Sequence, residues 1–201
     1  MGLKETVIGY MLQVAKHGDS WWMPLVLLLV VCCNSLTGGV FVGVLGVMQS
    51  TLFTITVMSR KYTWFLGPMM LCLGGMVASV TYMQIMNTSG VEALLLKAGL
   101  AESSWMEWGK QQAVSYGFSG LVVLSMTPAP TVTVVIAGML AKIPETTILL
   151  AIFGSRMTTL SLTAAVLRFG TEQKSAEKFI REQFGMVEET KEKGKDAKKA
   201  E

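Results

Sequence analysis

Acidic residues are absent from a long part of this chain. None lies between Asp19 and Glu92, and the only basic residues in that interval are the neighbours Arg60 and Lys61. This pair separates two uncharged stretches, Ser20–Ser59 and Tyr62–Val91. Because a bilayer-spanning helix needs about 20 mostly apolar residues, the pattern argues against an ordinary soluble domain and predicts a multi-pass membrane protein.

Histidine and cysteine are scarce as well. His17 is the single histidine, and the three cysteines, Cys32, Cys33 and Cys72, lie inside apolar runs. Such cysteines behave as small hydrophobes, and one histidine is too few for a His-based metal site or a catalytic triad. We therefore expect no metal, no cofactor and no covalent catalytic step. The net charge of only +3 gives no reason to expect a nucleic-acid partner.

Two later segments also carry almost no charge. Gln111–Ala141 is uncharged, and Thr146–Leu167 is interrupted by Arg156 alone. Over the whole chain 15% of the residues are charged and the mean hydropathy is +0.49, whereas about a quarter of the residues of soluble domains are charged. The length leaves room for one membrane domain with short polar ends.

Two of the apolar runs contain helix-breaking clusters at their centres. Asn34–Gly39 interrupts the first run after an apolar segment, Trp22–Cys33, that is too short to cross a bilayer. Met126–Thr131 interrupts the other run and contains Pro128 and Pro130. Proline lacks a backbone donor and disfavours helix in the residue before it. We predict two re-entrant helical hairpins; ordinary spans with a kink are the alternative.

The two interrupted runs follow one plan. Shifting the first by 92 positions places Asn34–Gly39 on Met126–Thr131 and Gly46 on Gly138. Longer apolar segments follow each break, at 63–86 and 146–168. Paired, interrupted hydrophobic segments are typical of inverted repeats that form a binding site. We therefore predict an all-α polytopic membrane protein with two inverted repeats, each a re-entrant hairpin followed by a transmembrane helix.

This plan divides the chain into parts. We expect a cytosolic amphipathic segment at 1–20, repeat one at 21–90, a connector at 91–112, repeat two at 113–169 and a charged cytosolic tail at 170–201 with a short amphipathic helix near Ala176–Phe184. The connector mixes leucine and tryptophan with glutamate and lysine, which predicts a helix on the membrane surface. An ordinary loop is the alternative.

The breaks are the predicted site. Backbone at membrane depth must be hydrogen-bonded inside the protein or line a wet cavity, so two facing breaks would form a polar vestibule. The side chains expected to line it are Asn34, Ser35, Thr37, Thr127, Pro128, Pro130 and Thr131. Glycines at small-residue spacing allow close approach of another helix, and those expected to do so are Gly39, Gly43, Gly46 and Gly138.

Arg156 is the one charge predicted near the bilayer midplane. An arginine there costs about 2.5–3.5 kcal/mol on insertion scales and marks a pathway or a partner. No acid lies inside any of the apolar runs. A guanidinium matches a phosphate with two parallel hydrogen bonds, so a lipid phosphate is one candidate partner. The other candidates are backbone carbonyls at Pro128–Pro130.

The C-terminal residues suggest a signal for localisation in the cell. Lys198 and Lys199 occupy the positions of a dilysine signal, which is read by a cytosolic coat-protein retrieval machinery and is not an anchor. We therefore expect an endoplasmic-reticulum or Golgi membrane protein with both termini in the cytosol. Arg60 and Lys61 then lie on the cytosolic side, as the positive-inside rule requires. Asn87 begins a glycosylation sequon on the lumenal side.

Several short motifs resemble those of the VTT/DedA superfamily, also called SNARE-associated Golgi proteins. In order they are Tyr116-Gly117-Phe118, Leu124-Ser125-Met126-Thr127-Pro128, Ala137-Gly138-Met139 and Gly154-Ser155-Arg156. The resemblance implies two oppositely oriented re-entrant hairpins and a role in moving phospholipid between leaflets or in lipid-dependent traffic. Two features depart from the family: the first break has neither acid nor proline, and Ser125-Met126 stand where an arginine is common.

These departures weaken proton-coupled transport, whereas passive scrambling needs only a polar groove. Our leading hypothesis is therefore an endoplasmic-reticulum phospholipid scramblase or lipid transporter, with membrane phospholipids as its partners. The rival hypotheses are a non-transporting assembly or trafficking factor, whose methionine-rich helices pack against other membrane proteins, and an ion- or proton-coupled carrier. A second copy of the chain is a further partner that the sequence allows.

Overall fold

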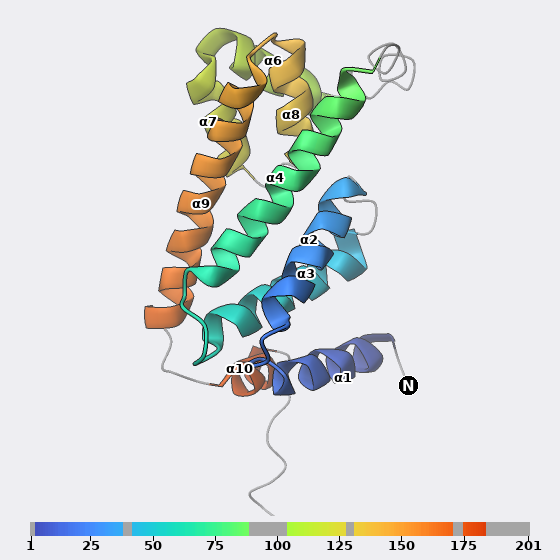
Figure 1. Ribbon diagram of the computed structural model, residues 1–201, viewed down its shortest axis with the longest axis vertical. Coiled ribbons are helices and arrows are strands. Elements are labelled where there is room, and N and C mark those ends of the chain that lie inside the picture. Colours follow the sequence, from blue (N-terminus) through green and yellow to red (C-terminus); the bar gives the residue numbers. More distant parts are fainter. Residues whose placement is uncertain (1–2, 38–41, 89–103, 128–130, 171–174, 184–201) are drawn as a thin grey trace, which may run out of the picture.

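The computed structural model describes residues 3–37, 42–88, 104–127, 131–170 and 175–183, and these residues form helices and turns without a strand. Two helices, α4 (Leu66–Met86) and α9 (Glu145–Gly170), are long and apolar enough to cross a bilayer. They pack against each other and run through most of the height of the molecule (Figure 1). The predicted all-helical class is confirmed for the described part of the chain.

Contacts at both ends fix α4 and α9 in antiparallel order. At one end the ring of Trp64, just before α4, packs edge-on against the ring of Phe169 near the end of α9, with 6.3 Å between ring centroids. At the other end Asn87 Nδ2 donates to Glu145 Oε1 at 2.8 Å. Glu145 begins α9, where the helix dipole favours a carboxylate. The two helices therefore start and finish at matching levels.

The first hairpin consists of α2 (Met23–Leu36) and α3 (Val42–Met58). Both helices pack against α4, and α3 also touches α9. The helix continues through Asn34 and Ser35 to Leu36, so the expected break at Asn34 begins too early. Polar side chains do not end a helix when neighbouring groups hydrogen-bond its last turn, as they do here. Gly39, the last residue of the expected break, lies outside the described residues.

The second hairpin consists of α7 (Phe118–Met126) and α8 (Thr131–Leu140). Its break falls where the two prolines predict it. Here α7 packs mainly against α9, and α8 packs against both α4 and α9. Lys142 adopts a positive φ of 56° after α8, and the N–H of Ile143 donates to the carbonyl of Gly138 at 3.0 Å. This is a Schellman ending, which hydrogen-bonds otherwise unpaired carbonyls.

The connector ends in a helix that covers the second hairpin. Helix α6 (Ser104–Tyr116) packs against α7 and α8 and buries Met106 and Ala113. It extends past the predicted connector boundary at 112, and residues 89–103 lie outside the described part. Gly117 follows with a φ of +54°, a conformation that L side chains rarely adopt, and so allows the turn into α7.

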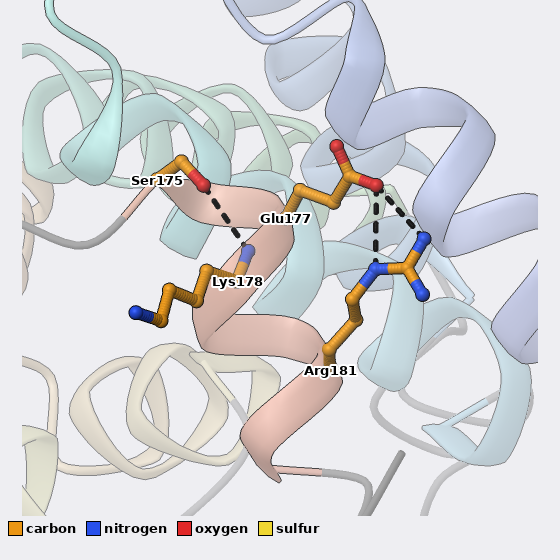
Figure 2. A network of polar contacts seen from close by, with 4 residues as sticks. All are labelled: Ser175, Glu177, Lys178 and Arg181. Atoms are coloured by element: carbon orange, nitrogen blue, oxygen red, sulfur yellow. Dashed lines mark hydrogen bonds and ion pairs between the residues drawn. The ribbon is translucent and has the colours of Figure 1, made fainter. Parts of the chain in front are cut away.

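Two amphipathic helices lie across the other end of the molecule (Figure 1). They are α1 (Leu3–Lys16) and α10 (Ala176–Gln183), and they pack against each other and against α3. Helix α10 buries Ile180 against α2 and α3 residues and presents its polar residues outward. Its position confirms the helix expected near Ala176–Phe184. Arg181 and Glu177 form an ion pair on its surface at 2.9 Å (Figure 2).

A polar junction joins this end to α3 and α9. Arg168 Nη1, in the last turn of α9, donates to the carbonyls of Val57 and Ser59 at 2.7 and 2.8 Å. These carbonyls lie at the end of α3, where cations are favoured by the helix dipole. Ser59 Oγ in turn donates to Asp19 Oδ1 at 2.5 Å. One guanidinium thus ties the end of α9 to the end of the first hairpin.

Tyr62 adds a second link at the same level. Its hydroxyl donates to the carbonyl of Ser20, which connects the loop after α3 to the loop before α2. Burial, and then the nearby Asp19 carboxylate, raise the pKa of Tyr62. Both effects favour the protonated hydroxyl, which is the form that can donate this hydrogen bond.

Two separate apolar cores form, one around each hairpin. The core around the first hairpin includes Met23, Leu27, Val31, Leu52, Ile55, Leu71, Ala164 and Ile180. The core around the second includes Met83, Met106, Leu121, Leu124, Val135, Ala137, Ile148 and Ile152. Helices α4 and α9 contribute to both cores, so these two helices hold the halves of the molecule together.

Gly74 permits the closest approach between α2 and α4. A Cβ atom placed on Gly74 would lie 2.5 Å from Val31 Cγ1 and 2.9 Å from Val31 Cβ, whereas a Cβ on the adjacent Gly75 would meet no atom within 4 Å. Side chains inserted into a packed interface force backbone shifts. The absent side chain at 74 is therefore a requirement of this interface.

We expect Gly74→Ala to destabilise the purified protein by about 2 kcal/mol, because α2 must move away from α4. Gly75→Ala is the matched control, and it should be neutral or stabilising by up to about 1 kcal/mol, since alanine is the better helix former. Thermal unfolding in detergent measures both. Equal midpoints for the two variants would contradict the close α2–α4 approach.

Candidate functional site

The end of α2 is held by a tyrosine from α4. The hydroxyl of Tyr82 lies 3.1 Å from the carbonyl of Ser35 and 2.9 Å from that of Leu36. Thr37 Oγ1 donates to the carbonyl of Cys33 at 2.9 Å and lies 3.1 Å from that of Asn34. The last carbonyls of α2 are thus hydrogen-bonded by side chains. The Thr37 hydroxyl, expected to line a vestibule, folds back onto its own helix.

Asn34 forms the polar contact between the two helices of the first hairpin. Its Nδ2 donates to Gln49 Oε1 of α3 at 2.8 Å. Its Oδ1 is buried and receives no hydrogen bond. A buried acceptor of this kind favours an added donor, such as water or a hydroxyl or ammonium group of a ligand. Gln49 and Tyr82 were not among the residues predicted from the sequence.

The second tip has only hydroxyl groups in its described part. Thr127 is extended, with φ −73° and ψ 162°, as expected before proline, and its Oγ1 donates to the carbonyl of Leu124 at 2.5 Å. Ser125 Oγ is buried and makes no hydrogen bond. Thr131, half-buried, begins α8. Pro128 and Pro130 lie outside the described residues.

Arg156 lies near the middle of α9 with most of its side chain buried. Helix α4, which packs against α9, carries the buried Cys72. Counted along α4, Cys72 and Tyr82 are separated by about 15 Å at the rise of an α-helix. Tyr82, and with it the capped end of α2, lies near the end of α4, whereas Cys72 lies in the first half of that helix.

The predicted packing glycines behave differently from one another. A Cβ on Gly138 would lie 2.8 Å from Ile148, so α8 approaches α9 closely there. A Cβ on Gly43 would meet nothing within 4 Å, which means that Gly43 marks no helix contact within the described chain. Gly46 and Gly43 instead line an open groove of about 650 Å³ between α3 and the helices α1 and α10.

The candidate site therefore consists of polar groups at the ends of broken helices and of one largely buried arginine on α9. No group of three or more metal-ligating side chains occurs in the described ranges. The groups present can hydrogen-bond a polar or anionic ligand, whereas nothing among them forms a nucleophile–base pair. No family model matches the chain, and no curated protein or solved structure is significantly similar to it.

Sequence reasoning had few means of finding Tyr82 and Gln49. Each is a single polar group in an apolar helix, and each contacts a residue far away in sequence, 46 or 47 positions for Tyr82 and 15 for Gln49. The only sequence feature that could have indicated these two residues is a hydrogen-bonding side chain at a position where contact with lipid or with the protein core would favour an apolar one.

We expect Tyr82→Phe to lower stability by about 1 kcal/mol, because the end of α2 loses its donor. In a domain of this size that corresponds to about 3 °C in the unfolding midpoint. Tyr116→Phe is the matched control, since Tyr116 is exposed, and should leave the midpoint unchanged. Equal effects of the two substitutions, measured by thermal unfolding in detergent, would mean that the hydroxyl of Tyr82 does not hold α2.

Proposed function

We propose that this chain is a multi-pass membrane protein of the VTT/DedA type that moves phospholipid between the leaflets of an intracellular membrane. It does so without a covalent step, by offering a polar path between broken helices. The observation that carries the proposal is the largely buried Arg156 near the middle of α9, a helix that packs against α3 of the first hairpin and against α7 and α8 of the second.

The exposed surfaces of α4 and α9 support a membrane location. Only 39% of the apolar window of α4 and 28% of that of α9 is buried inside the molecule, whereas the core helix of a soluble protein would be mostly buried. The large apolar side chains left exposed include Leu73, Val77, Val80, Leu150, Phe153, Leu162 and Val166. Soluble monomers rarely expose apolar surface on this scale, and lipid would cover it.

The arrangement of the hairpins supports inverted repeats. The first lies toward the α1–α10 end and the second toward the α6 end (Figure 1). The first helix of each hairpin packs on the long helix of its own repeat, α2 on α4 and α7 on α9, and the second helix of each touches the long helix of the other repeat. Such repeats are typical of transporters with a site at the bilayer midplane.

The charge distribution supports an orientation. Near the α1–α10 end the described bases are Lys16, Arg60, Lys61, Arg168, Lys178 and Arg181, against the acids Asp19, Glu177 and Glu182. At the other end Lys110 and Lys142 are balanced by Glu107 and Glu145. The positive-inside rule assigns the α1–α10 end to the cytosol. Helices α1 and α10 then lie on the cytosolic side.

A lipid phosphate suits the proposed path better than a cation does. Arg156 supplies a permanent positive charge that can hold a phosphate with two hydrogen bonds. Asn34 Oδ1 and Ser125 Oγ are buried polar atoms without a hydrogen bond, and they offer further polar contacts. Carboxylates are absent from the described parts of the apolar helices α2, α3, α4, α7 and α8, and the one in α9 is at its first residue. Proton-coupled transport therefore lacks its usual groups.

One observation favours a second function. Gly43 and Gly46 lie on an open face of α3 beside Val47 and Ser50, and small residues on a membrane helix allow a partner helix to pack closely. A non-transporting assembly or trafficking factor would use such a face. Lipid movement by the purified protein alone distinguishes the two functions.

The decisive experiment is reconstitution into liposomes with a fluorescent phospholipid, followed by bleaching with dithionite from outside. We expect the protein to make the inner-leaflet lipid accessible. Arg156→Ala should slow this step at least tenfold, since a single charge-assisted hydrogen bond of about 1.5 kcal/mol already corresponds to a factor of about ten and alanine removes both bonds to the phosphate. Lys61→Ala, which removes an exposed base, is the control. Bleaching no faster than in empty liposomes would refute lipid movement.

Cysteine labelling tests the membrane location and the hairpins together. In a variant with Cys32, Cys33 and Cys72 replaced, we expect Ser35→Cys and Thr127→Cys to react with a water-soluble maleimide, because Ser35 is in the last turn of α2 and Thr127 directly follows α7, each next to a proposed wet break. Leu29→Cys and Val123→Cys are the controls: both positions are exposed on the protein but should face lipid, where a thiol rarely ionises.

Labelling of the two controls in membranes would remove the bilayer assignment. Lack of reaction at both tips in correctly inserted protein would instead remove the wet hairpins. Because the hairpins enter from opposite faces, a reagent confined to one side should label Ser35→Cys and Thr127→Cys to different extents.

A further inference from the structure

A second polar cavity, far from the hairpin tips, opens at the α1–α10 end. It has a volume of about 670 Å³ and lies between the end of α1, the end of α3, the last residues of α9 and the start of α10. Its ionisable lining residues are Lys16, Asp19, Arg60, Arg168 and Glu177. None of these residues belongs to the predicted lipid path.

The two acids of this cavity already have donors. Asp19 Oδ1 accepts from Ser59 Oγ at 2.5 Å, and Glu177 Oε1 is paired with Arg181 at 2.9 Å on the surface of α10 (Figure 2). Arg168 also has partners, since its Nη1 holds the carbonyls that end α3. Arg181 neutralises Glu177, whereas the Ser59 hydroxyl and the carbonyls held by Arg168 leave the charges of Asp19 and Arg168 in place.

Lys16 and Arg60 are the bases that remain. Both line the cavity and are exposed, and within the described ranges neither forms an ion pair or a side-chain hydrogen bond. The start of α10 contributes Ser175, Ala176 and Glu177 to the lining, so the positive end of its helix dipole adds to the same potential. Among the described lining residues, the bases Lys16, Arg60 and Arg168 outweigh Asp19, because Glu177 is paired with Arg181, so their net charge is positive.

The floor of the cavity is apolar. Ala15, Ile55 and Met58 line it, and the side chains of Ile55 and Met58 are buried in the body of the protein. A ligand with a compact anionic group beside an apolar part would satisfy both kinds of surface. Phosphate is the anion that paired Lys and Arg side chains recognise most readily.

We propose that this cavity binds the phosphate group of a phosphate ester, distinct from any lipid in transit past Arg156. The ester comes either from a phospholipid of the adjacent leaflet or from a soluble metabolite. The lipid source rests on the proposed membrane orientation, which places this end at the anionic cytosolic surface. The recognition of a phosphate group by the cavity does not depend on that orientation.

The test uses the full-length protein in a neutral detergent, with the unfolding midpoint measured as ligand is added. The three ligands are dihexanoyl phosphatidic acid, inorganic phosphate and dihexanoylglycerol, which lacks the phosphate. The variant is Lys16→Ala with Arg60→Ala. The control, Lys61→Ala with Lys178→Ala, removes the same charge from exposed positions outside the cavity lining.

We expect phosphatidic acid to raise the midpoint of the wild type and of the control, and to act on the Lys16→Ala/Arg60→Ala variant only at concentrations at least tenfold higher. If inorganic phosphate produces the same shift at similar concentrations, the source is soluble; if it does not, the source is a lipid. Equal shifts in both double variants, no shift in the wild type, or an equal shift with dihexanoylglycerol would each overturn the proposal.

The same variants in the dithionite assay separate this site from the proposed function. Loss of phosphate binding with lipid movement at the wild-type rate would place the two activities at different sites, as proposed. Phosphate binding by a wild-type protein that moves no lipid would refute the scramblase and leave this cavity standing. Loss of lipid movement in Lys16→Ala/Arg60→Ala but not in its control would overturn the separation of the two sites.

Discussion

Helices α2, α3, α7 and α8 are shorter than a bilayer is thick, and every unpaired backbone group at their inner ends would cost several kcal/mol in hydrocarbon. The remaining architecture depends on how those ends are satisfied. Tyr82 supplies a donor for the inner end of α2 and Thr127 for that of α7. At the outer ends, Arg168 holds the last carbonyls of α3, and α8 closes on itself at Lys142. Two of these donors come from α4 and α9, so the long helices hold the hairpins by hydrogen bonds as well as by apolar packing.

The two hairpins differ in the polar groups at their tips. At the first, an amide pair, Asn34 and Gln49, joins the two helices and leaves one buried acceptor. At the second, Thr127 and Ser125 provide hydroxyl groups, and the extended backbone before Pro128 turns the chain. Neither hairpin carries a titratable side chain in its described tip. A path built from amides and hydroxyls suits a ligand that brings its own charge, which is the reason that a phosphate and the buried Arg156 belong in one proposal.

Local signals and distant contacts explain how much the sequence could predict. The two long apolar helices and the second break follow from apolar length and from two prolines, which act within a few residues. The first break was placed too early, because Asn34 and Ser35 are weak helix breakers when Tyr82 and Gln49 bind the same turn. Arg168 contacts residues 109 and 111 positions away, and no local pattern reports such a pairing. The sequence signalled the polar candidates of the site but could not say which of them, like Thr37, serve only their own helix.

The compositions of the two apolar cores imply an order of assembly during synthesis. The core around the second hairpin draws its buried residues from Met83 to Ile152, one continuous part of the chain. The core around the first hairpin begins at Met23 but is completed by Ala164 and Ile180. Domains usually form from the N-terminus as the chain emerges. Here the core around the first hairpin is completed only after the last helices have been synthesised, so the core around the second hairpin can form before it. A ribosome-bound chain that stops after α8 would therefore expose the incomplete first core.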